Sequence, residues 1–388
     1  MTVGNYYNAP AKPDPVNINT PRDYDANTYL HELSKTGAPE KLIKDAVKSG
    51  ADIDAVNKNG MTPLGLAIVN GHVATAAALM EAGAKLYFEE DGLKKGQFFN
   101  AAVLAAGRGD KKMLEAVLQK GGGAFVNMTG IDAAGYDDRY YALHTAIRKR
   151  NTGIIATLVD AGAFLDAESG PKKETPVMTA INQNDGDAIA RLVKQGASME
   201  HIHSQTGDTP LLFACKNSLR TGATRLLSLG ADVKVADKEG RTPLMAAAER
   251  GELTLVTEIL KQNPDVNARS KNRETALMLG AKSGNADIIK ALLKAGADPL
   301  LTDAFNKSAR AYAETAPKRG YNNNSYNNRD PYYYDDDGYH PRRSGGYNDN
   351  YNNSSSIIKT LEEAEKDALQ KQFEASYNRF RKNSGPGG

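Results

Sequence analysis

One short pattern recurs along most of this chain, and it limits the possible folds more than any other feature. Residues 242–251 read Thr-Pro-Leu-Met-Ala-Ala-Ala-Glu-Arg-Gly, and residues 275–284 read Thr-Ala-Leu-Met-Leu-Gly-Ala-Lys-Ser-Gly. Their first positions are 33 residues apart, since 275 minus 242 is 33. A fixed period of this length indicates a repeat array, in which each unit buries its apolar face by stacking on its neighbours.

The first position of the pattern can be followed along the chain at Thr28, Thr62, Asn100, Tyr141, Thr175, Thr209, Thr242, Thr275 and Ser308. The intervals between these residues are 34, 38, 41, 34, 34, 33, 33 and 33. We therefore predict eight full units and a ninth, partial one.

Each position of the pattern has a structural reason. A threonine at the first position accepts a hydrogen bond from an unpaired N–H group of the helix that follows. Proline comes next in four units, where a helix needs no N–H group, and glycine then tolerates the left-handed conformation that ends this helix. These residues are Pro63, Pro176, Pro210 and Pro243, and Gly71, Gly109, Gly251 and Gly284. Apolar residues at helical spacing follow, which predicts a second helix in each unit.

This pattern resembles the ankyrin repeat, and the resemblance covers residues 24–316. It implies an all-α fold, a solenoid of helix-turn-helix units with hairpin fingers. It also implies protein–protein recognition without substrate turnover, so we expect no enzyme. In this family a histidine ties down a neighbouring loop, and His31 and His144 occupy that position; His72 matches another structural position. The chain departs from the family where Arg150, Asn184 and Ser218 replace the glycine that ends the first helix.

The ends of the chain differ from the array. Residues 1–23 are expected to form an extended arm. Residues 317–356 form a low-complexity linker that holds eight of the 18 tyrosines and lacks large aliphatic residues, so we expect disorder there. Residues 357–383 are expected to form an amphipathic helix, followed by a disordered end at 384–388.

Two intervals between units are longer than the rest. The additional residues lie within 88–96 and 127–138, before the first helices of the third and fourth units. We expect them to lengthen the fingers of these units. A specific contact with a partner and a tolerated surface insertion are both compatible with this.

Composition narrows the function classes. The chain contains no apolar run long enough for a transmembrane helix, and residues 1–10 do not resemble a signal peptide. The compartment is not determined: the cytoplasm is favoured, and secretion or the periplasm would require a signal removed before residue 1. The single cysteine, Cys215, is expected to be a buried thiol. His201 and His203 have metal-like spacing without a third ligand, so we predict neither a metal site nor a cofactor.

The variable positions of the repeats indicate where a partner would bind. In ankyrin arrays the two residues before the helix-ending glycine line the concave groove. Here they are mainly basic, although the net charge of the whole chain is only +2. The predicted groove residues are Lys35, Arg108, Arg148, Lys149, Lys216, Arg250 and Lys282. The predicted finger residues are Lys58, Lys94, Lys95, Lys172, Lys173, Lys238 and Lys271.

We interpret these positions as a surface that binds an acidic segment of a partner protein, which makes the chain an adaptor. A groove kept soluble by its charges is the competing interpretation. Nucleic acid is a poor fit, because aspartates offset the arginines among the tyrosines of the linker.

A different class of function is a self-assembling scaffold, driven by residues 318–388. The terminal helix would then pair with a second copy. It could alternatively cap the array or enter a partner's groove.

Overall fold

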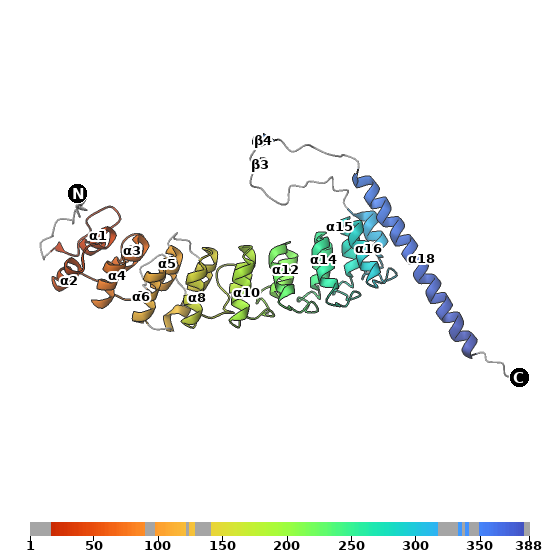
Figure 1. The fold of residues 1–388 in the computed structure, drawn as a ribbon, viewed down its shortest axis with the longest axis horizontal. Helices are drawn as coiled ribbons and strands as arrows, with labels where there is room; N and C mark the ends of the chain where they lie inside the picture. Colours follow the sequence, from red (N-terminus) through yellow and green to blue (C-terminus); the bar gives the residue numbers. More distant parts are fainter. Residues whose placement is uncertain are drawn as a thin grey trace. The chain divides into compact units, whose positions relative to one another are not determined.

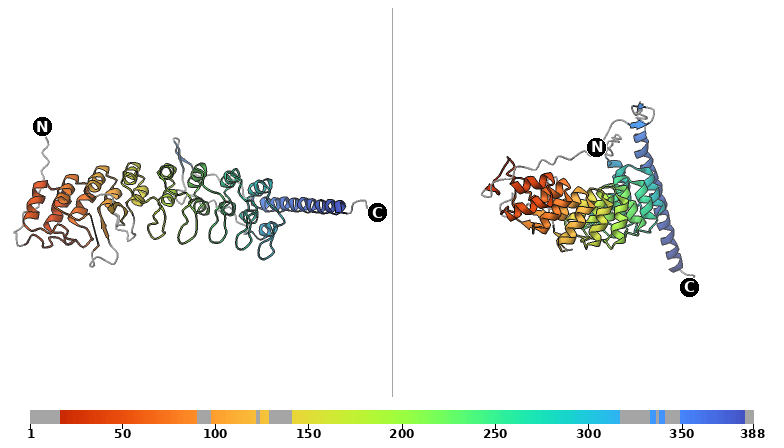
Figure 2. Two further views of the ribbon diagram at one scale, coloured as in Figure 1. Left: turned by 90° about the horizontal axis from the view of Figure 1, so that it is seen from below. Right: turned by 60° about the vertical axis from the view of Figure 1, so that its left-hand side comes forward.

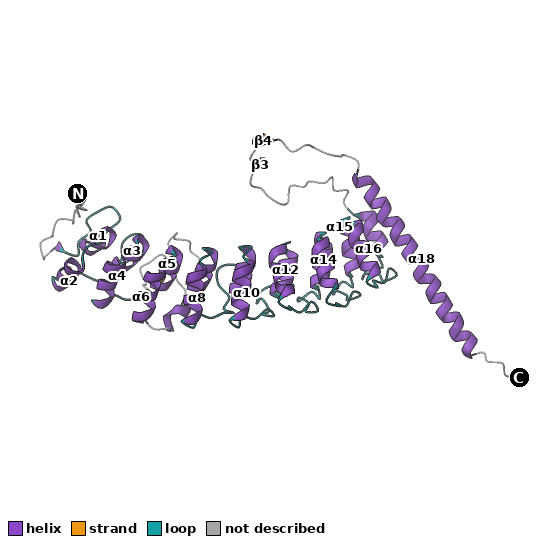
Figure 3. Cartoon of the chain, viewed as in Figure 1, coloured by secondary structure: helices purple, strands orange, loops and turns teal. Residues whose placement is uncertain are grey.

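The computed structural model describes residues 17–89, 98–121, 124–128, 141–316, 333–335, 338–340 and 349–383. Almost all of the regular structure in these residues is α-helical (Figure 3). The chain divides into two compact units, residues 1–205 and 206–388, which are described separately. None of the described helices is both long and apolar enough to cross a membrane.

The first unit contains five helix pairs (Figure 1). The first helix of each pair packs on the first helix of the next pair, and the second helices of the first four pairs form a parallel row (Figure 2). The pairs are α1 (Tyr29–Thr36) with α2 (Glu40–Lys48), α3 (Pro63–Asn70) with α4 (Val73–Glu81), α5 (Ala101–Arg108) with α6 (Lys111–Gly121), α7 (Ala142–Arg148) with α8 (Thr152–Asp160), and α9 (Pro176–Asn182) with α10 (Gly186–Lys194).

The second unit continues the same design with three pairs, then a single helix and a long terminal helix. The pairs are α11 (Pro210–Lys216) with α12 (Arg220–Ser228), α13 (Pro243–Arg250) with α14 (Leu253–Leu260), and α15 (Ala276–Ser283) with α16 (Ala286–Lys294). The single helix is α17 (Ala309–Thr315), and the terminal helix is α18 (Asp349–Asn383). The predicted solenoid of helix-turn-helix units is therefore confirmed within each unit. We call the first helix of each pair, together with α17, an inner helix.

Every inner helix starts at the position that the sequence period predicts. The residue preceding each is one of the nine pattern residues, from Thr28 to Ser308. Six of them accept a backbone N–H with the side chain, as Thr62 does from Gly65 at 3.0 Å. Tyr141 and Ser308 make no such bond, so position in the repeat, and not capping alone, sets the helix start.

The inner helices end in left-handed residues. Gly71, Gly109, Gly251 and Gly284 have φ between 76° and 80°. The three residues that replace glycine, namely Arg150, Asn184 and Ser218, adopt the same region with φ of 54° to 56°. This conformation costs an L-residue about 1 kcal/mol, which stacking of the neighbouring units offsets.

Short turns in the fingers are built by a side chain five residues before the inner-helix cap. Asn57, Asp237 and Asp303 each accept two backbone N–H groups of their own turn with Oδ1. Fingers are also joined to each other along the array, since the backbone N–H of Lys271 donates to the carbonyl of Glu239 at 2.9 Å. Successive fingers are therefore connected by backbone hydrogen bonds and are not independent loops.

The finger of the third repeat has a strand pair at its base. Strands β1 (Tyr87–Glu89) and β2 (Phe98–Asn100) are antiparallel, with Phe88 opposite Phe99. The predicted all-α fold did not include this short strand pair. Residues 90–97 lie outside the described residues, as do 129–140 of the second long interval. A 3₁₀ turn, η2 (Ala124–Asn127), precedes the latter.

The C-terminal segment differs from its predicted bounds. Helix α18 begins at Asp349, eight residues before the predicted start at residue 357. A second strand pair, β3 (Tyr333–Asp335) with β4 (Gly338–His340), falls within the predicted linker. The other residues of that linker before Asp349, and residues 384–388, lie outside the described residues. Of the predicted arm, residues 1–16 also lie outside them, whereas Ile18 is buried and the side chain of Asn19 donates to the carbonyl of Gly50 in the first repeat.

Candidate interaction surface

The predicted groove residues occupy equivalent places in the fold. Each lies in the last turn of an inner helix or immediately after it: Lys35 in α1, Arg108 in α5, Arg148 and Lys149 at the end of α7, Lys216 in α11, Arg250 in α13 and Lys282 in α15. Neighbouring inner helices pack side by side, so within each unit these residues lie along one row. Their chemical surroundings differ between the two units.

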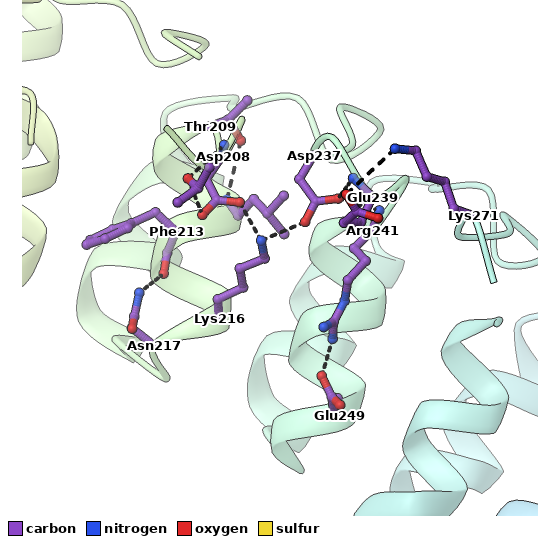
Figure 4. Close-up of polar contacts among 12 residues, drawn as sticks. Asp208, Thr209, Phe213, Lys216, Asn217, Asp237, Glu239, Arg241, Glu249 and Lys271 are labelled. Carbon is purple, nitrogen blue, oxygen red and sulfur yellow. Dashed lines mark hydrogen bonds and ion pairs between the residues drawn. The ribbon is translucent and has the colours of Figure 1, made fainter. Parts of the chain in front are cut away.

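Lys216 is held between two carboxylates (Figure 4). Its Nζ lies 2.5 Å from Oδ1 of Asp208 and 2.6 Å from Oδ2 of Asp237. Both aspartates are buried, at 4% and 9% exposure. Asp208 precedes α11 and Asp237 belongs to the next finger, so the ammonium group joins two successive repeats. This charge is already engaged inside the protein.

The surroundings of Asp237 favour its ionised form. Burial by itself raises the pKa of this carboxyl group. The hydrogen bond from Lys216 and those from the backbone amides of Arg241 and Glu239 outweigh that effect and hold the pKa below its ordinary value. Lys216 therefore stabilises a buried negative charge.

Two further cations of the second unit share one acceptor. Glu249 pairs with Arg241 through one carboxylate oxygen and with Lys282 through the other, at 3.4 Å for Lys282. Burial raises the pKa of Glu249, but the bond and charge of Arg241, with Lys282, bring it below the ordinary value. Glu249, which directly precedes Arg250 in α13, thus neutralises the neighbouring Lys282.

Three of the predicted groove cations of the first unit lack such an ion pair among the described residues. Lys35, Arg108 and Lys149 are exposed, and none of them forms an ion pair with another described residue. The guanidinium group of Arg108 reaches back to α3 and donates to the carbonyl of Val69 at 2.5 Å, which leaves its charge uncompensated. Arg148 is half-buried, and its charge helps to lower the pKa of the neighbouring His144.

The predicted finger lysines also differ between the units. Lys58 lies 4.3 Å from the ring centroid of Tyr24, while Lys172 and Lys173 are exposed in one turn. Like the three groove cations, these lysines form no ion pair with a described residue. In the second unit, Lys271 lies 3.6 Å from Glu239, and the side chain of Lys238 packs against Gly207. Lys94 and Lys95 lie outside the described residues.

The second unit therefore keeps one predicted groove cation without an internal acidic partner. Arg250 is exposed at the end of α13 and forms no ion pair with a described residue. Its neighbours Lys216 and Lys282 are both paired. Uncompensated positive charge on the inner-helix row is therefore greater in the first unit.

The histidines of the pattern hold neighbouring backbone segments in place through hydrogen bonds, and His31 and His144 are buried. Nε2 of His31 donates to the carbonyl of Met61 at 3.0 Å, and that of His144 to Glu174 at 2.9 Å. Burial lowers the pKa of His144 to about 4, so its ring is neutral near pH 7. His72 bonds the carbonyl of Lys35 at 3.1 Å. These bonds agree with the structural roles predicted for all three residues.

The two histidines with metal-like spacing point to different neighbours. Nε2 of His203, which is buried, donates to the carbonyl of Lys172 at 2.8 Å. His201 lies 3.5 Å from the carboxylate of Glu168. In the part of the chain that the structure describes, no group of three potential metal ligands occurs. His203 thus shapes the turn that presents Lys172 and Lys173.

A cluster of a tyrosine and two carboxylates in the last repeat was not predicted, and Asp303 is its buried member. The hydroxyl of Tyr312 lies 2.9 Å from Oδ2 of Asp303 and 3.1 Å from Oε1 of Glu274. Burial and these carboxylates raise the pKa of Tyr312. The five-residue spacing from Asp303 to Ser308, repeated from Asp237 to Thr242, is the sequence signal that marks the finger turns. The contact with Tyr312 has no such signal.

Comparison with known families agrees with the geometry. A family model described as ankyrin repeats (3 copies) matches residues 219–303, and another, described as ankyrin repeats (many copies), matches residues 16–79. The search of curated proteins gave no match. The matched segments lie in different compact units, and each spans helix pairs of the kind described above.

Proposed function

We propose that the chain, whose residues 16–79 and 219–303 match models of ankyrin repeats, binds an acidic segment of a partner protein through the inner-helix row of its first unit. Ankyrin repeats are protein–protein interaction modules. The residues in contact would be Lys35, Arg108, Arg148 and Lys149. Lys58, Lys172 and Lys173 of the fingers would extend this surface. The function is that of an adaptor, without turnover of a substrate.

One observation carries the proposal, namely that Lys35, Arg108 and Lys149 form no ion pair with another described residue. A partner's carboxylates can pair with Lys35, Arg108 and Lys149 without displacing an internal ion pair. Binding at Lys216 would instead compete with Asp208 and Asp237. Exposed, uncompensated cations also speed the encounter with an acidic partner in a salt-dependent way.

The competing interpretation, a groove kept soluble by its charges, predicts no dependence on position. The two interpretations predict different results when two triple variants of the full chain are compared. The test variant is Lys35→Gln, Arg108→Gln and Lys149→Gln, all at exposed sites of the inner-helix row. The control is Lys48→Gln, Lys112→Gln and Lys194→Gln, which removes the same charge at exposed sites on the second helices of the same unit.

The measurement is affinity capture from source-cell lysate at low and moderate salt, with mass spectrometry of the retained proteins. We expect the unaltered chain and the control to retain an acidic protein at low salt and to lose it at moderate salt. The test variant should bind it about tenfold more weakly, since three exposed ion pairs of roughly 0.5 kcal/mol each are lost. Equal weakening by both triples would contradict the proposal.

Neutralising Lys216 is a poor test of binding, although the residue belongs to the predicted groove. Its removal leaves two buried aspartates facing each other and so perturbs the array itself. Lys216→Gln is therefore kept out of the binding experiment.

A further inference from the structure

The first part of α18 is docked on the end of the array. Ile357 and Leu361 are buried, at 1% and 0% exposure, where α18 packs against α16 and α17 (Figure 1). Arg310 of α17 lies 3.5 Å from Glu362 and 3.7 Å from Glu365. This face of α18 is covered by the chain's own last repeat.

The second part of α18 leaves the array. Every residue from Leu369 to Arg379 is exposed, so about three turns of helix have no covered side. Leu369, Phe373 and Tyr377 follow each other at intervals of four and are 55%, 67% and 58% exposed. The rings of Phe373 and Tyr377 stack with centroids 6.4 Å apart. We call these three residues the distal stripe.

The distal stripe does not lie on the same face of α18 as the docked residues Ile357 and Leu361. Successive helical residues are turned by about 100°, which places the stripe roughly 140° around the helix from Ile357 and Leu361. It therefore points away from the array. A short helix without tertiary contacts is marginal in water, and three large apolar residues in one row on such a helix indicate a surface that another helix covers.

The charges of α18 select the partner. Before the stripe the helix is acidic, with Glu362, Glu363, Glu365 and Asp367 against Lys359 and Lys366, and Glu362 and Glu365 already pair with Arg310. After the stripe the helix is basic, with Arg379, Arg381 and Lys382. An antiparallel second copy would bring the basic end of one helix to the acidic end of the other. A parallel copy would set like charges side by side.

We propose that two copies of the chain pair through antiparallel contact of their α18 distal stripes. Centred on Phe373, the pairing puts Leu369 of one copy level with Tyr377 of the other, because both lie four residues from Phe373. Asp367 is then level with Arg379 of the other copy. This pairing uses none of the inner-helix row residues, so it does not rest on the function proposed above, and each dimer would carry two copies of that row.

The test is sedimentation equilibrium of the full chain across a range of protein concentrations. We expect a reversible monomer–dimer equilibrium that weakens as salt is raised. Phe373→Glu should raise the dimer dissociation constant by about tenfold or more, since it buries a charge at the centre of the contact. Asn378→Glu is the matched control: it adds the same charge on the opposite side of the exposed helix and should leave the dissociation constant unchanged.

Two outcomes would overturn the pairing. One is a chain that stays monomeric at every concentration. The other is an equal effect of both substitutions while circular dichroism shows an intact helix content in each.

The antiparallel orientation of the two helices has its own test. Chains with Leu369→Cys are mixed with chains carrying Tyr377→Cys and oxidised, with Cys215 being fully buried in both. Antiparallel pairing favours the mixed disulfide, whereas a predominance of like-with-like disulfides would refute it.

Discussion

At the scale of single residues, the decisive property of a surface cation here is whether the chain already supplies its counter-ion. Lys149 and Lys216 occupy corresponding ends of inner helices, yet only Lys216 has two buried carboxylates within 2.6 Å. Lys216 therefore stabilises the fold, as a core residue does. Sequence position alone gives both lysines the same role.

This difference predicts the stability effect of Lys216→Ala. The substitution leaves Asp208 and Asp237 buried and unpaired, and we expect a loss of about 2 kcal/mol. That is below the 3–5 kcal/mol typical of a broken buried pair, because the lysine itself is a quarter exposed. Lys282→Ala, which breaks an exposed pair with Glu249, should cost at most about 0.5 kcal/mol. Urea unfolding of the full chain at pH 7 measures both, and equal losses would contradict the assignment.

The loss should also depend on pH. The pKa of Asp237 is lower in the folded chain than its ordinary value of about 3.9. A depressed carboxyl pKa adds stability that is present above pH 3.9 and disappears as pH falls through the folded value. The difference between the unaltered chain and Lys216→Ala should therefore be constant from pH 5 to 7 and shrink below about pH 4. A difference that grows on acidification would have the wrong sign.

At the scale of elements, α18 carries one buried and one exposed apolar row. Substitutions in each row can show which of them stabilises the array. Leu361 is fully buried against the last repeat, whereas Leu369 is 55% exposed. Leu361→Ala should cost about 2 kcal/mol locally and speed hydrogen exchange in α17. Leu369→Ala removes the same atoms and should leave α17 exchange unchanged. Faster exchange from both substitutions would show that the exposed row also supports the array.

The sequence predicted the elements of the array far better than it predicted their contacts. The nine inner-helix starts follow from the residue period alone, because capping and proline chemistry are local. The pairing of Lys216 with Asp208 and Asp237 joins residues 8 and 21 positions away and depends on how two repeats stack. The same holds for Tyr312 between Asp303 and Glu274. Charge partners across repeats are set by packing, which a single sequence does not reveal.

The predicted start of α18 was wrong for a local reason. Residues 349–356, Asp-Asn-Tyr-Asn-Asn-Ser-Ser-Ser, include six Asn and Ser residues, which favour caps and turns. The helix nevertheless starts at Asp349. Propensity is a weak guide where a helix continues from a docked segment such as Ile357 to Leu361.

At the scale of the whole molecule, stability is distributed over neighbouring repeats and not gathered in one core. Within each compact unit, each inner helix contacts the next, and no single repeat can bury its own apolar face. The chain divides into two compact units, residues 1–205 and 206–388. Damage to one repeat should therefore spread to its neighbours and weaken with distance along the array.

Leu227 of α12 offers the test, because it is 6% exposed and Leu227→Ala should cost about 2–5 kcal/mol. In native-state hydrogen exchange, amides of α11 to α14 should lose protection most, those of α15 and α16 less, and those of α1 to α6 not measurably. The corresponding substitution in the first unit, Leu158→Ala at a fully buried site of α8, should give a gradient centred on α7 and α8 instead. Uniform loss along the chain in both variants would mean that all the repeats unfold as one cooperative body, and the additive description of this array would then fail.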